Sequence, residues 1–391
     1  MSTSTEPPMS DKLFGGRRFS TAMWDFSWAT RRSGTEAEYA DWPKVLDELA
    51  DRGYDSVRID AFPHLMHLDR ASVAPRRPGF MWGNHGPVEI SPRDDLIEFV
   101  GLCAARDIKV GLSSWFSERP DHSEVTVRSP DDYVTVWDRT LGVLDAAGLT
   151  DSVVWVDLCN EFPLDLWAPG AAKSIFGYRL PFRALPLRVA PWTATNRERA
   201  SQFYVDSIRG LRERWPEFQY CFSMSDISGQ ALRTLDVSEF DLAEVHCWAT
   251  DDPSWSRKSR QAQVLLELRG SLKRHAGKAI RYSEADIEAI VDDALAPLMS
   301  QWAEWAAEHE LPLVTTEAWG PVNYTDVDLG IGIDEWAWIR RLTEQAVGRA
   351  VDLGWQGICT SNFCQPHHRG MWADAGWHRE MTREIRGRTS V

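Results

Sequence analysis

The sequence predicts a single closed barrel of eight parallel strands, each followed by a helix. Three observations lead to this fold class. Amphipathic helical stretches alternate with short apolar stretches from end to end of the chain, and such alternation demands a parallel sheet. Eight of the short stretches can be found, which indicates that the sheet closes on itself. Polar and charged residues stand where these stretches end, and α/β folds build their sites there.

The expected strands are short runs rich in β-branched and aromatic residues. Their length and the turn residues around them separate them from helices. They cover 19–24, 55–60, 108–115, 153–161, 219–224, 240–248, 311–317 and 355–362.

Periodicity and end signals predict the helices between these strands. In 41–53 the apolar residues recur with helical spacing, and Gly53 can close the helix. Ser91-Pro92 and Ser129-Pro130 each offer an N-cap residue followed by proline at the first helical position. Further helices are expected over about 196–215, 258–275, 290–309 and 334–353.

An open, doubly wound sheet is the alternative fold, but it would usually carry a glycine-rich phosphate-binding turn after its first strand, and none is visible. Two loops, at about 62–95 after the second strand and about 162–195 after the fourth, are long and rich in aromatic residues. We expect both to wall a pocket at the barrel mouth. Residues 1–12 are expected to be a flexible segment, which leaves 13–391 for the barrel domain.

Composition excludes several classes of partner. The 58 acidic and 43 basic residues give a formal charge of -15, which repels nucleic acid and anionic lipid, so neither nucleic acid nor membrane is expected to bind. No stretch could cross a bilayer, and the first residues lack the apolar core of a signal peptide, so a cytoplasmic location is expected. The six cysteines show no CxxC spacing, which favours buried fillers over metal ligands or disulfides.

Two glutamates, Glu161 and Glu317, each end an apolar run. A charge is poorly placed there for stability and well placed for chemistry, so the two carboxylates suggest an acid/base pair. For either glutamate alone, a structural salt bridge to Arg58 is the alternative. His64, His67, His85, His367 and His368 lack the spacing of a metal site, and no metal is expected. The other polar or aromatic residues at or near strand ends are Asp25, Asp60, Trp115, Asn160, His246, Trp248, Trp319, Asn362 and Phe363.

Taken in strand order, these residues form a set that resembles the clan A retaining glycoside hydrolases, the cellulase-like (β/α)8 enzymes similar to glycoside hydrolase family 5. The resemblance covers nearly the whole chain. It is carried by Arg58 on the second strand, Asn160-Glu161 after the fourth, His246-Cys-Trp248 on the sixth and Thr-Glu317-Ala-Trp319 at the end of the seventh.

The resemblance implies a role for each of these residues. Glu161 would be the general acid/base, Glu317 the nucleophile and Asn160 a donor to the sugar 2-hydroxyl. Arg58 would hold the nucleophile ionised, as a nearby guanidinium does. The two carboxyl groups are then expected about 5 Å apart, with a raised pKa on the acid. The remaining expected substrate-binding residues are Asp25, Trp115, His246, Trp248, Trp319 and Asn362.

The resemblance also implies a reaction, the double-displacement hydrolysis of a β-linked glycoside or short oligosaccharide. The two long aromatic loops and the expected cytoplasmic location favour an exo-acting enzyme with a small carbohydrate substrate. No cofactor is expected, because two carboxylates suffice. The sequence departs from the family in three places. Trp248 stands where tyrosine is common. After the third strand, where members often carry a histidine, the chain has Ser113-Ser-Trp115, and after the eighth, where they often carry a tryptophan, it has Ser361-Asn-Phe363. A non-catalytic carbohydrate-binding barrel and a barrel enzyme of other chemistry, a lyase or a metal-dependent isomerase, stay open as alternatives.

Overall fold

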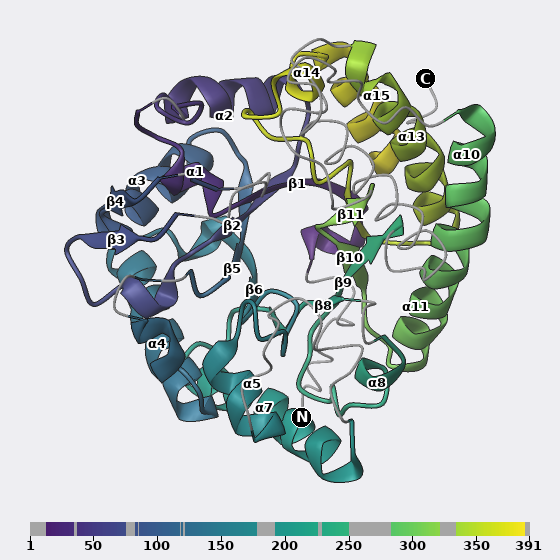
Figure 1. Cartoon of the computed structure of the whole chain (residues 1–391). Helices are drawn as coiled ribbons and strands as arrows, with labels where there is room; N and C mark the ends of the chain where they lie inside the picture. Colours follow the sequence, from purple (N-terminus) through teal and green to yellow (C-terminus); the bar gives the residue numbers. More distant parts are fainter. Residues whose placement is uncertain are drawn as a thin grey trace, which may run out of the picture.

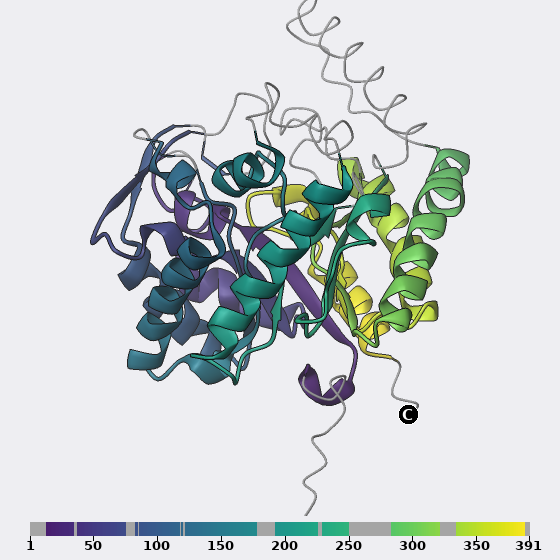
Figure 2. The ribbon, with the colours of Figure 1, turned by 90° about the horizontal axis from the view of Figure 1, so that it is seen from below.

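The computed structural model shows strands curled around a central axis, with helices in a ring outside them (Figures 1 and 2). Among the described residues, no helix has both the length and the apolar character needed to span a membrane. Residues 1–12 and the helix expected over 258–275 lie outside the described residues. Those described are 13–34, 37–75, 83–84, 86–117, 119, 122–177, 192–225, 229–249, 283–320 and 334–387.

The strands of the barrel pair in parallel, in the order β11-β9-β10-β12-β1-β2-β5-β6-β7, and β8 pairs with β9. Because β7 and β8 belong to one segment, that segment joins β6 on one side and β9 on the other, which closes the ring. Each of the eight segments predicted as strands holds strand residues, so the barrel prediction is confirmed. The strands are β1 (Phe19–Asp25), β2 (Ser56–Asp60), β5 (Lys109–Ser113), β6 (Val153–Asp157), β7 (Tyr220–Cys221), β8 (Met224–Ser225), β9 (Ala243–Trp248), β10 (Leu313–Thr315), β11 (Ala318–Trp319) and β12 (Gly357–Cys359).

Helices follow the strands, and most lie where the sequence predicts them. The stretch expected as one helix over 290–309 begins with a π-helical turn at 290–295. The long loop after β2 contains an antiparallel pair, β3 (Ala71–Val73) and β4 (Val88–Ile90). Within the described residues the α-helices are α1 (Ser27–Thr30), α2 (Trp42–Asp51), α3 (Pro92–Ala104), α4 (Pro130–Ala146), α5 (Pro169–Phe176), α7 (Ala194–Arg212), α8 (Gly229–Leu232), α10 (Glu284–Ala289), α11 (Ala296–Glu308), α13 (Ala337–Asp352), α14 (Arg369–Trp372) and α15 (Ala375–Arg386).

The two predicted serine caps differ in the structure. Ser129 caps α4 as expected, since its side chain accepts from the Asp132 N–H and the Asp132 carboxylate accepts in return from the Ser129 N–H. Ser91 occupies the N-cap position of α3, but its hydroxyl makes no capping hydrogen bond. Instead the Asp95 carboxylate, one turn into the helix, accepts from the Ser91 N–H at 2.9 Å. The predicted helix start at Ser91-Pro92 is therefore confirmed, but a backbone N–H and not the serine hydroxyl makes the hydrogen bond there.

Aromatic rings fill the barrel where two glycines make room for them. Phe19 on β1 and Trp155 on β6 lie on strands that are not neighbours, yet their ring centres are 6.0 Å apart, so they meet across the interior. A Cβ atom on Gly111 would overlap the Trp155 ring, and one on Gly357 would overlap the Phe19 ring. These glycines are therefore required by close packing.

Candidate active site

Backbone hydrogen bonds extend the parallel pairing beyond β6 and fix the position of Glu161. The Asn160 N–H donates to Ser114 O at 2.8 Å, and the Phe162 N–H donates to Ser223 O at 3.1 Å. Between them, the Glu161 N–H donates to Ser223 Oγ at 2.9 Å. Glu161 has a φ of 47°, in the left-handed region that costs free energy for a residue with a Cβ and persists where the surroundings impose it. Such strain is typical of functional positions.

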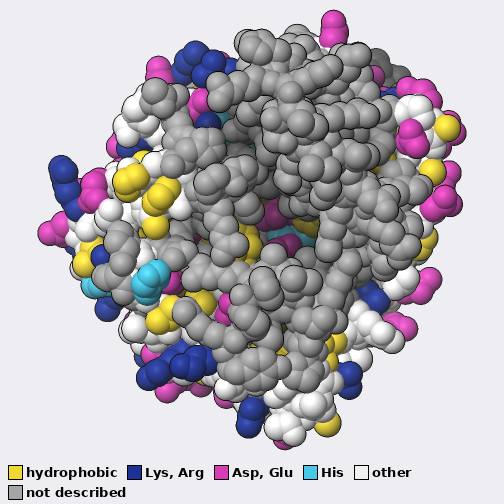
Figure 3. All heavy atoms as spheres, in the orientation of Figure 1, with side chains coloured by type: hydrophobic (Ala, Val, Ile, Leu, Met, Phe, Trp, Pro, Cys, Tyr) yellow, Lys and Arg dark blue, Asp and Glu magenta, His cyan; other side chains and the backbone are white. Residues whose placement is uncertain are grey.

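The two predicted glutamates meet at the barrel mouth, with His246 between them. One oxygen of each carboxylate and a ring nitrogen of His246 all lie within 4.8 Å of one another. His246 Nδ1 is 3.1 Å from Glu161 Oε1 and 3.6 Å from Glu317 Oε2. Glu161 is 9% exposed and Glu317 7%, so both carboxylates are almost withdrawn from solvent. In Figure 3, acidic and histidine side chains are visible at the bottom of the central opening of this face.

Arg58 is fully buried and reaches groups from several strands. Its Nη1 pairs with Glu317 Oε1 at 3.0 Å, and its Nη2 pairs with Asp157 Oδ2 at 2.6 Å and donates to Asn160 Oδ1 at 2.7 Å. The guanidinium also lies over the Trp115 ring, 4.5 Å from its centre. Glu317 therefore does form the salt bridge to Arg58 that the sequence offered as an alternative to catalysis. The same cluster also brings Glu317 close to Glu161.

Two buried carboxylates of this cluster, Asp157 and Glu244, were not predicted. Asp157 accepts from Ser113 Oγ at 2.5 Å as well as from Arg58. Glu244 accepts from Thr316 through both the backbone N–H and the hydroxyl. A signal for both was present, because each is a charge inside a buried strand. Glu244 also lies two residues before His246, which puts both side chains on one face of β9.

The surroundings move the pKa values of these groups in different directions. Burial raises the pKa of Glu317 to about 7, although His246 and Arg58 oppose it. Burial also acts to raise the pKa of Glu161, but the hydrogen bonds from His246 and Trp167 and the His246 charge lower it overall. Burial opposes the charge of His246, but Glu244 and Glu317 raise its pKa well above the ordinary value. The expected raised pKa on Glu161 is therefore not found in the free site.

Other predicted site residues have partners within the protein. The Trp319 indole N–H donates to Cys359 O at 3.1 Å, and Trp319 is level with the buried Trp248 in the β11-β9 pairing. Asp25 accepts from the Ser27 N–H and from Gln365 Nε2 at 3.1 Å. These contacts engage the Asp25 carboxylate within the protein.

The side-chain amide of Asn362 differs from Trp319 and Asp25 in its hydrogen bonding. Its backbone N–H donates to Ala318 O at 2.8 Å, which places it beside the strand segment that carries Glu317. Its side chain is fully buried, and neither its oxygen nor its nitrogen has a hydrogen-bond partner within the described part of the chain. Asn160 Nδ2 is buried and unpaired in the same way. Unpaired buried amides are costly, so both are candidates to bind a polar ligand.

The loop after β6 supplies Trp167, a site residue that the sequence did not predict. Trp167 donates its indole N–H to Glu161 Oε2 at 3.1 Å and packs against Phe26. In the loop after β2, Asn84 donates to Ala74 O at 3.2 Å, which gives it a role in the loop fold. Four further aromatic or histidine residues of these loops, which the sequence offered as pocket walls, lie outside the described residues: Trp82, His85, Tyr178 and Phe182.

Glu161, His246 and Glu317 could in principle surround a cation. A metal takes the lone pair of a neutral imidazole. Both ring nitrogens of His246 instead face carboxylate oxygens, Nε2 lying 3.2 Å from Glu244, so the set fits an imidazolium better than a metal ligand. His64, also considered as a ligand, is 3.1 Å from Ser117 O, and burial lowers its pKa to about 3.

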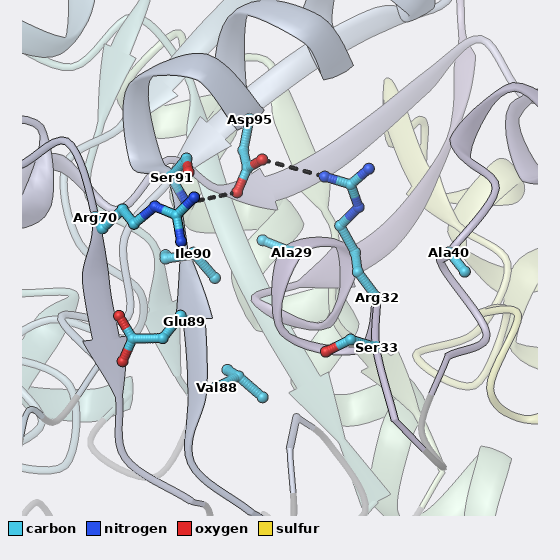
Figure 4. A pocket seen from close by; sticks show the side chains of 10 residues that line it. All are labelled: Ala29, Arg32, Ser33, Ala40, Arg70, Val88, Glu89, Ile90, Ser91 and Asp95. Carbon is cyan, nitrogen blue, oxygen red and sulfur yellow. Dashed lines mark hydrogen bonds and ion pairs between the residues drawn. The ribbon is translucent and has the colours of Figure 1, made fainter.

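A separate cavity of about 320 Å³ lies beside α1 and the start of α3 (Figure 4). Arg32 pairs there with Asp95 at 3.1 Å and lies over the Trp42 ring. Its charge is therefore balanced within the protein. The lining residues are Ala29, Arg32, Ser33, Ala40, Arg70, Val88, Glu89, Ile90, Ser91 and Asp95.

Comparison with solved structures supports the fold and the family. A protein of Parabacteroides distasonis ATCC 8503, described as a "putative glycoside hydrolase", is 30% identical with a TM-score of 0.75, covering 95% of this chain and 94% of its own. The exo-β-1,4-mannosidase Op5Man5 from Opitutaceae bacterium strain TAV5 is 13% identical with a TM-score of 0.53, covering 96% and 61%. GH5_18 from Streptomyces cattleya, solved with GlcNAc, is 14% identical with a TM-score of 0.52, covering 96% and 82%.

The last two structures share the fold alone, and no curated protein matched the sequence. A family model described as "Cellulase-like: Sugar-binding cellulase-like" matches residues 21–386, nearly the whole barrel. The chain therefore belongs to the sugar-binding cellulase-like family.

Proposed function

We propose that the protein is a retaining glycoside hydrolase that cleaves a β-linked glycoside or a short oligosaccharide by double displacement. The approach of Glu161 and Glu317, with ligand atoms within 4.8 Å, carries the proposal. Inverting enzymes hold a water between carboxyl groups roughly 6.5 to 9.5 Å apart, whereas retaining enzymes bring them to about 5 Å so that one carboxylate attacks directly.

The roles follow from the contacts. Glu317, paired with Arg58, attacks the anomeric carbon, and Glu161 protonates the leaving oxygen. Water then enters from the side of Glu161, which takes a proton from it as the oxygen attacks the anomeric carbon. The bond to Glu317 breaks, Glu317 leaves as a carboxylate and Glu161 is protonated again. The Nδ2 group of Asn160 and the amide of Asn362 bind sugar hydroxyls, and Trp115 packs beneath the Arg58 guanidinium.

The free site holds its proton in the wrong place for the first step. Burial keeps Glu317 protonated up to about pH 7, while His246 and Trp167 hold Glu161 ionised. A glycosidic oxygen beside Glu161 favours its protonated form, and the positive charge that develops at the anomeric carbon favours ionised Glu317. Substrate binding therefore moves a proton from Glu317 to Glu161. His246 Nδ1, in contact with both carboxylates, stabilises the charge during this exchange.

The proposed substrate is small and is attacked at its end. Both glutamates are less than a tenth exposed, and Trp167 from the loop after β6 contacts Glu161 directly. These features favour a closed pocket over a groove that would admit the middle of a polymer. All six cysteines are buried and none forms a disulfide, which fits a reducing compartment such as the cytoplasm.

Replacing either glutamate tests the pair. Glu161→Gln and Glu317→Gln should each reduce turnover of an identified chromogenic glycoside by several orders of magnitude, because each removes a distinct step, with an unchanged circular dichroism spectrum. Azide should rescue Glu317→Ala and yield a glycosyl azide of inverted configuration. Near-normal turnover by either Gln variant would end the assignment. Sugar-dependent thermal stabilisation without turnover would favour a binding protein, and loss of activity with a chelator would favour metal-dependent chemistry.

The first product tests stereochemistry and the site of attack together. Two inversions at one carbon give net retention, so proton NMR should show the anomer of the substrate before mutarotation. With an oligosaccharide substrate, the early product should be a single terminal sugar. The opposite anomer would contradict the role of Glu317, and random internal cleavage would contradict the closed pocket.

A further inference from the structure

His246 lies among three carboxylates that come from different parts of the barrel. Nδ1 faces Glu161 after β6 at 3.1 Å and Glu317 after β10 at 3.6 Å. Nε2 faces Glu244, on the same strand as His246, at 3.2 Å. Glu244 also lies near Arg58 on β2, whose Nη2 is 3.9 Å from its Oε2. His246 is fully buried, so solvent does not reach either nitrogen.

The contact between His246 Nε2 and Glu244 Oε2 is an ion pair whose geometry falls short of a hydrogen bond. Neither atom has a hydrogen-bond partner elsewhere among the described residues. Without a proton on Nε2, a nitrogen lone pair would face an anionic oxygen in a buried site, which is repulsive. A proton on each nitrogen instead gives every carboxylate around the ring a positive group to face.

We propose that Glu244 is a positioning residue that keeps His246 doubly protonated and cationic, so that its second N–H is always presented to the two glutamates of the mouth. The inference rests on the proposed function for its catalytic consequence and on geometry alone for the charge of His246. Nothing in the sequence motifs assigns a role to Glu244.

Glu244 is itself held as an anion. Its Oε1 accepts from the Thr316 N–H at 3.0 Å and from the Thr316 hydroxyl at 2.5 Å, and its side chain is fully buried. Although burial opposes the charge, His246 and Arg58 lower the pKa of Glu244 to about 2. Glu244 thus remains charged at any working pH, which makes it a fixed counter-ion for the ring.

A permanent cation explains how two carboxylates can stand so close together. Whichever of Glu161 and Glu317 is ionised before and after the proton exchange, the same imidazolium N–H is within reach of it. A neutral ring would leave the second ionisation opposed by a like charge at short range. The role of Glu244 is thus exerted through His246, without contact to substrate.

The test is the protonation state of His246, read by ¹⁵N NMR of the histidine rings and assigned with a His246→Asn variant. In the wild-type protein both ring nitrogens should stay protonated across neutral pH and well above it. In Glu244→Gln the ring should lose a proton about one to three pH units lower, because a charge in contact with the ring is gone. A neutral His246 at pH 7 in the wild type overturns the proposal, even if the variant does not fold.

Thr316→Val is the matched control, since it removes one hydrogen bond to Glu244 and keeps the carboxylate. Its His246 titration should follow the wild type. An equal shift in Thr316→Val and Glu244→Gln would assign the effect to packing and reject the charge-based role. With an identified substrate, Glu244→Gln should lower kcat by at least about tenfold, which corresponds to one pKa unit, while KM stays nearly constant.

The two proposals fail separately. If Glu244→Gln turned over substrate with the kcat of the wild type, the proposed effect of Glu244 on catalysis would be rejected. An absence of any glycosidase activity would count against the proposed function and leave the NMR test intact, because that readout needs no substrate.

Discussion

Glu161 and Glu317 are the same kind of residue in one buried site, yet their surroundings separate their pKa values. Glu161 receives an indole N–H and an imidazole N–H, and both stabilise its anion. Glu317 lies near the negative charges of Glu161 and Glu244 and is deeply buried, so its neutral form is favoured despite Arg58. Opposed pKa shifts in a close pair of carboxylates are typical of acid/base sites.

The pH dependence of kcat/KM should report this division. The reaction needs one proton in the pair, and the free site carries that proton on Glu317, so kcat/KM should fall as the pH rises through about 7, where the proton is lost. Glu161→Gln, assayed with an activated aryl glycoside that needs no acid, should lose this basic limb and show an acidic limb below pH 7, because the Glu161 charge that raises the pKa of Glu317 is gone. Steady-state kinetics from pH 4 to 9 would measure both limbs. A wild-type enzyme that keeps full activity well above pH 7 would contradict the proposed position of the proton.

At the scale of elements, α3 and α4 begin with the same Ser-Pro dipeptide and are capped differently. Asp132 is the third residue of α4 and forms a reciprocal pair with Ser129, whereas Asp95 is the fourth residue of α3 and reaches only the Ser91 backbone. The third residue of α3 is also an aspartate, Asp94, so the two caps differ in which carboxylate turns back to the serine and not in the residue type at that position.

These two caps give a matched pair of variants. Ser129→Ala should lower the free energy of unfolding by about 1 kcal/mol, the usual cost of losing a side-chain cap. Ser91→Ala should change it by less than about 0.5 kcal/mol, because no capping bond is lost. Urea unfolding followed by circular dichroism would compare them. Equal losses in both variants would show that the hydroxyl of Ser129 does not stabilise α4.

For the whole molecule, closure of the barrel depends on shape complementarity across its interior. Residues on strands that do not pair, Phe19 and Trp155, share that space, and glycine at 111 and 357 provides the volume that the rings occupy. Interiors are close-packed, so even one added methyl group must displace a neighbour.

Gly111→Ala should therefore destabilise the protein by about 1–3 kcal/mol, the typical cost of overpacking. Gly348→Ala is the control, because it lies within helix α13 with open space around its Cβ position, and there alanine should stabilise by up to about 1 kcal/mol. Thermal melting would rank the two variants against the wild type. A Gly111→Ala protein that melts at the wild-type temperature would show that the Trp155 ring can move aside at little cost.

Sequence alone determined the order of elements and the face on which chemistry gathers. Alternating periodicities identify parallel strands, and parallel strands bring their C-terminal ends to one edge. Arg58, Asn160, Glu161, His246 and Glu317 are therefore expected together on one face. Local signals of this kind need no knowledge of distant contacts.

Tertiary structure alone decided what each of these groups does to the others. Glu244 becomes a counter-ion, and Trp167 a donor to Glu161, only because residues far apart in the chain meet in space. The pKa values depend on burial and on charges a few ångströms away, and neither can be read from spacing along the chain. For the same reason the expected raised pKa was assigned to Glu161, whereas in the free site it belongs to Glu317.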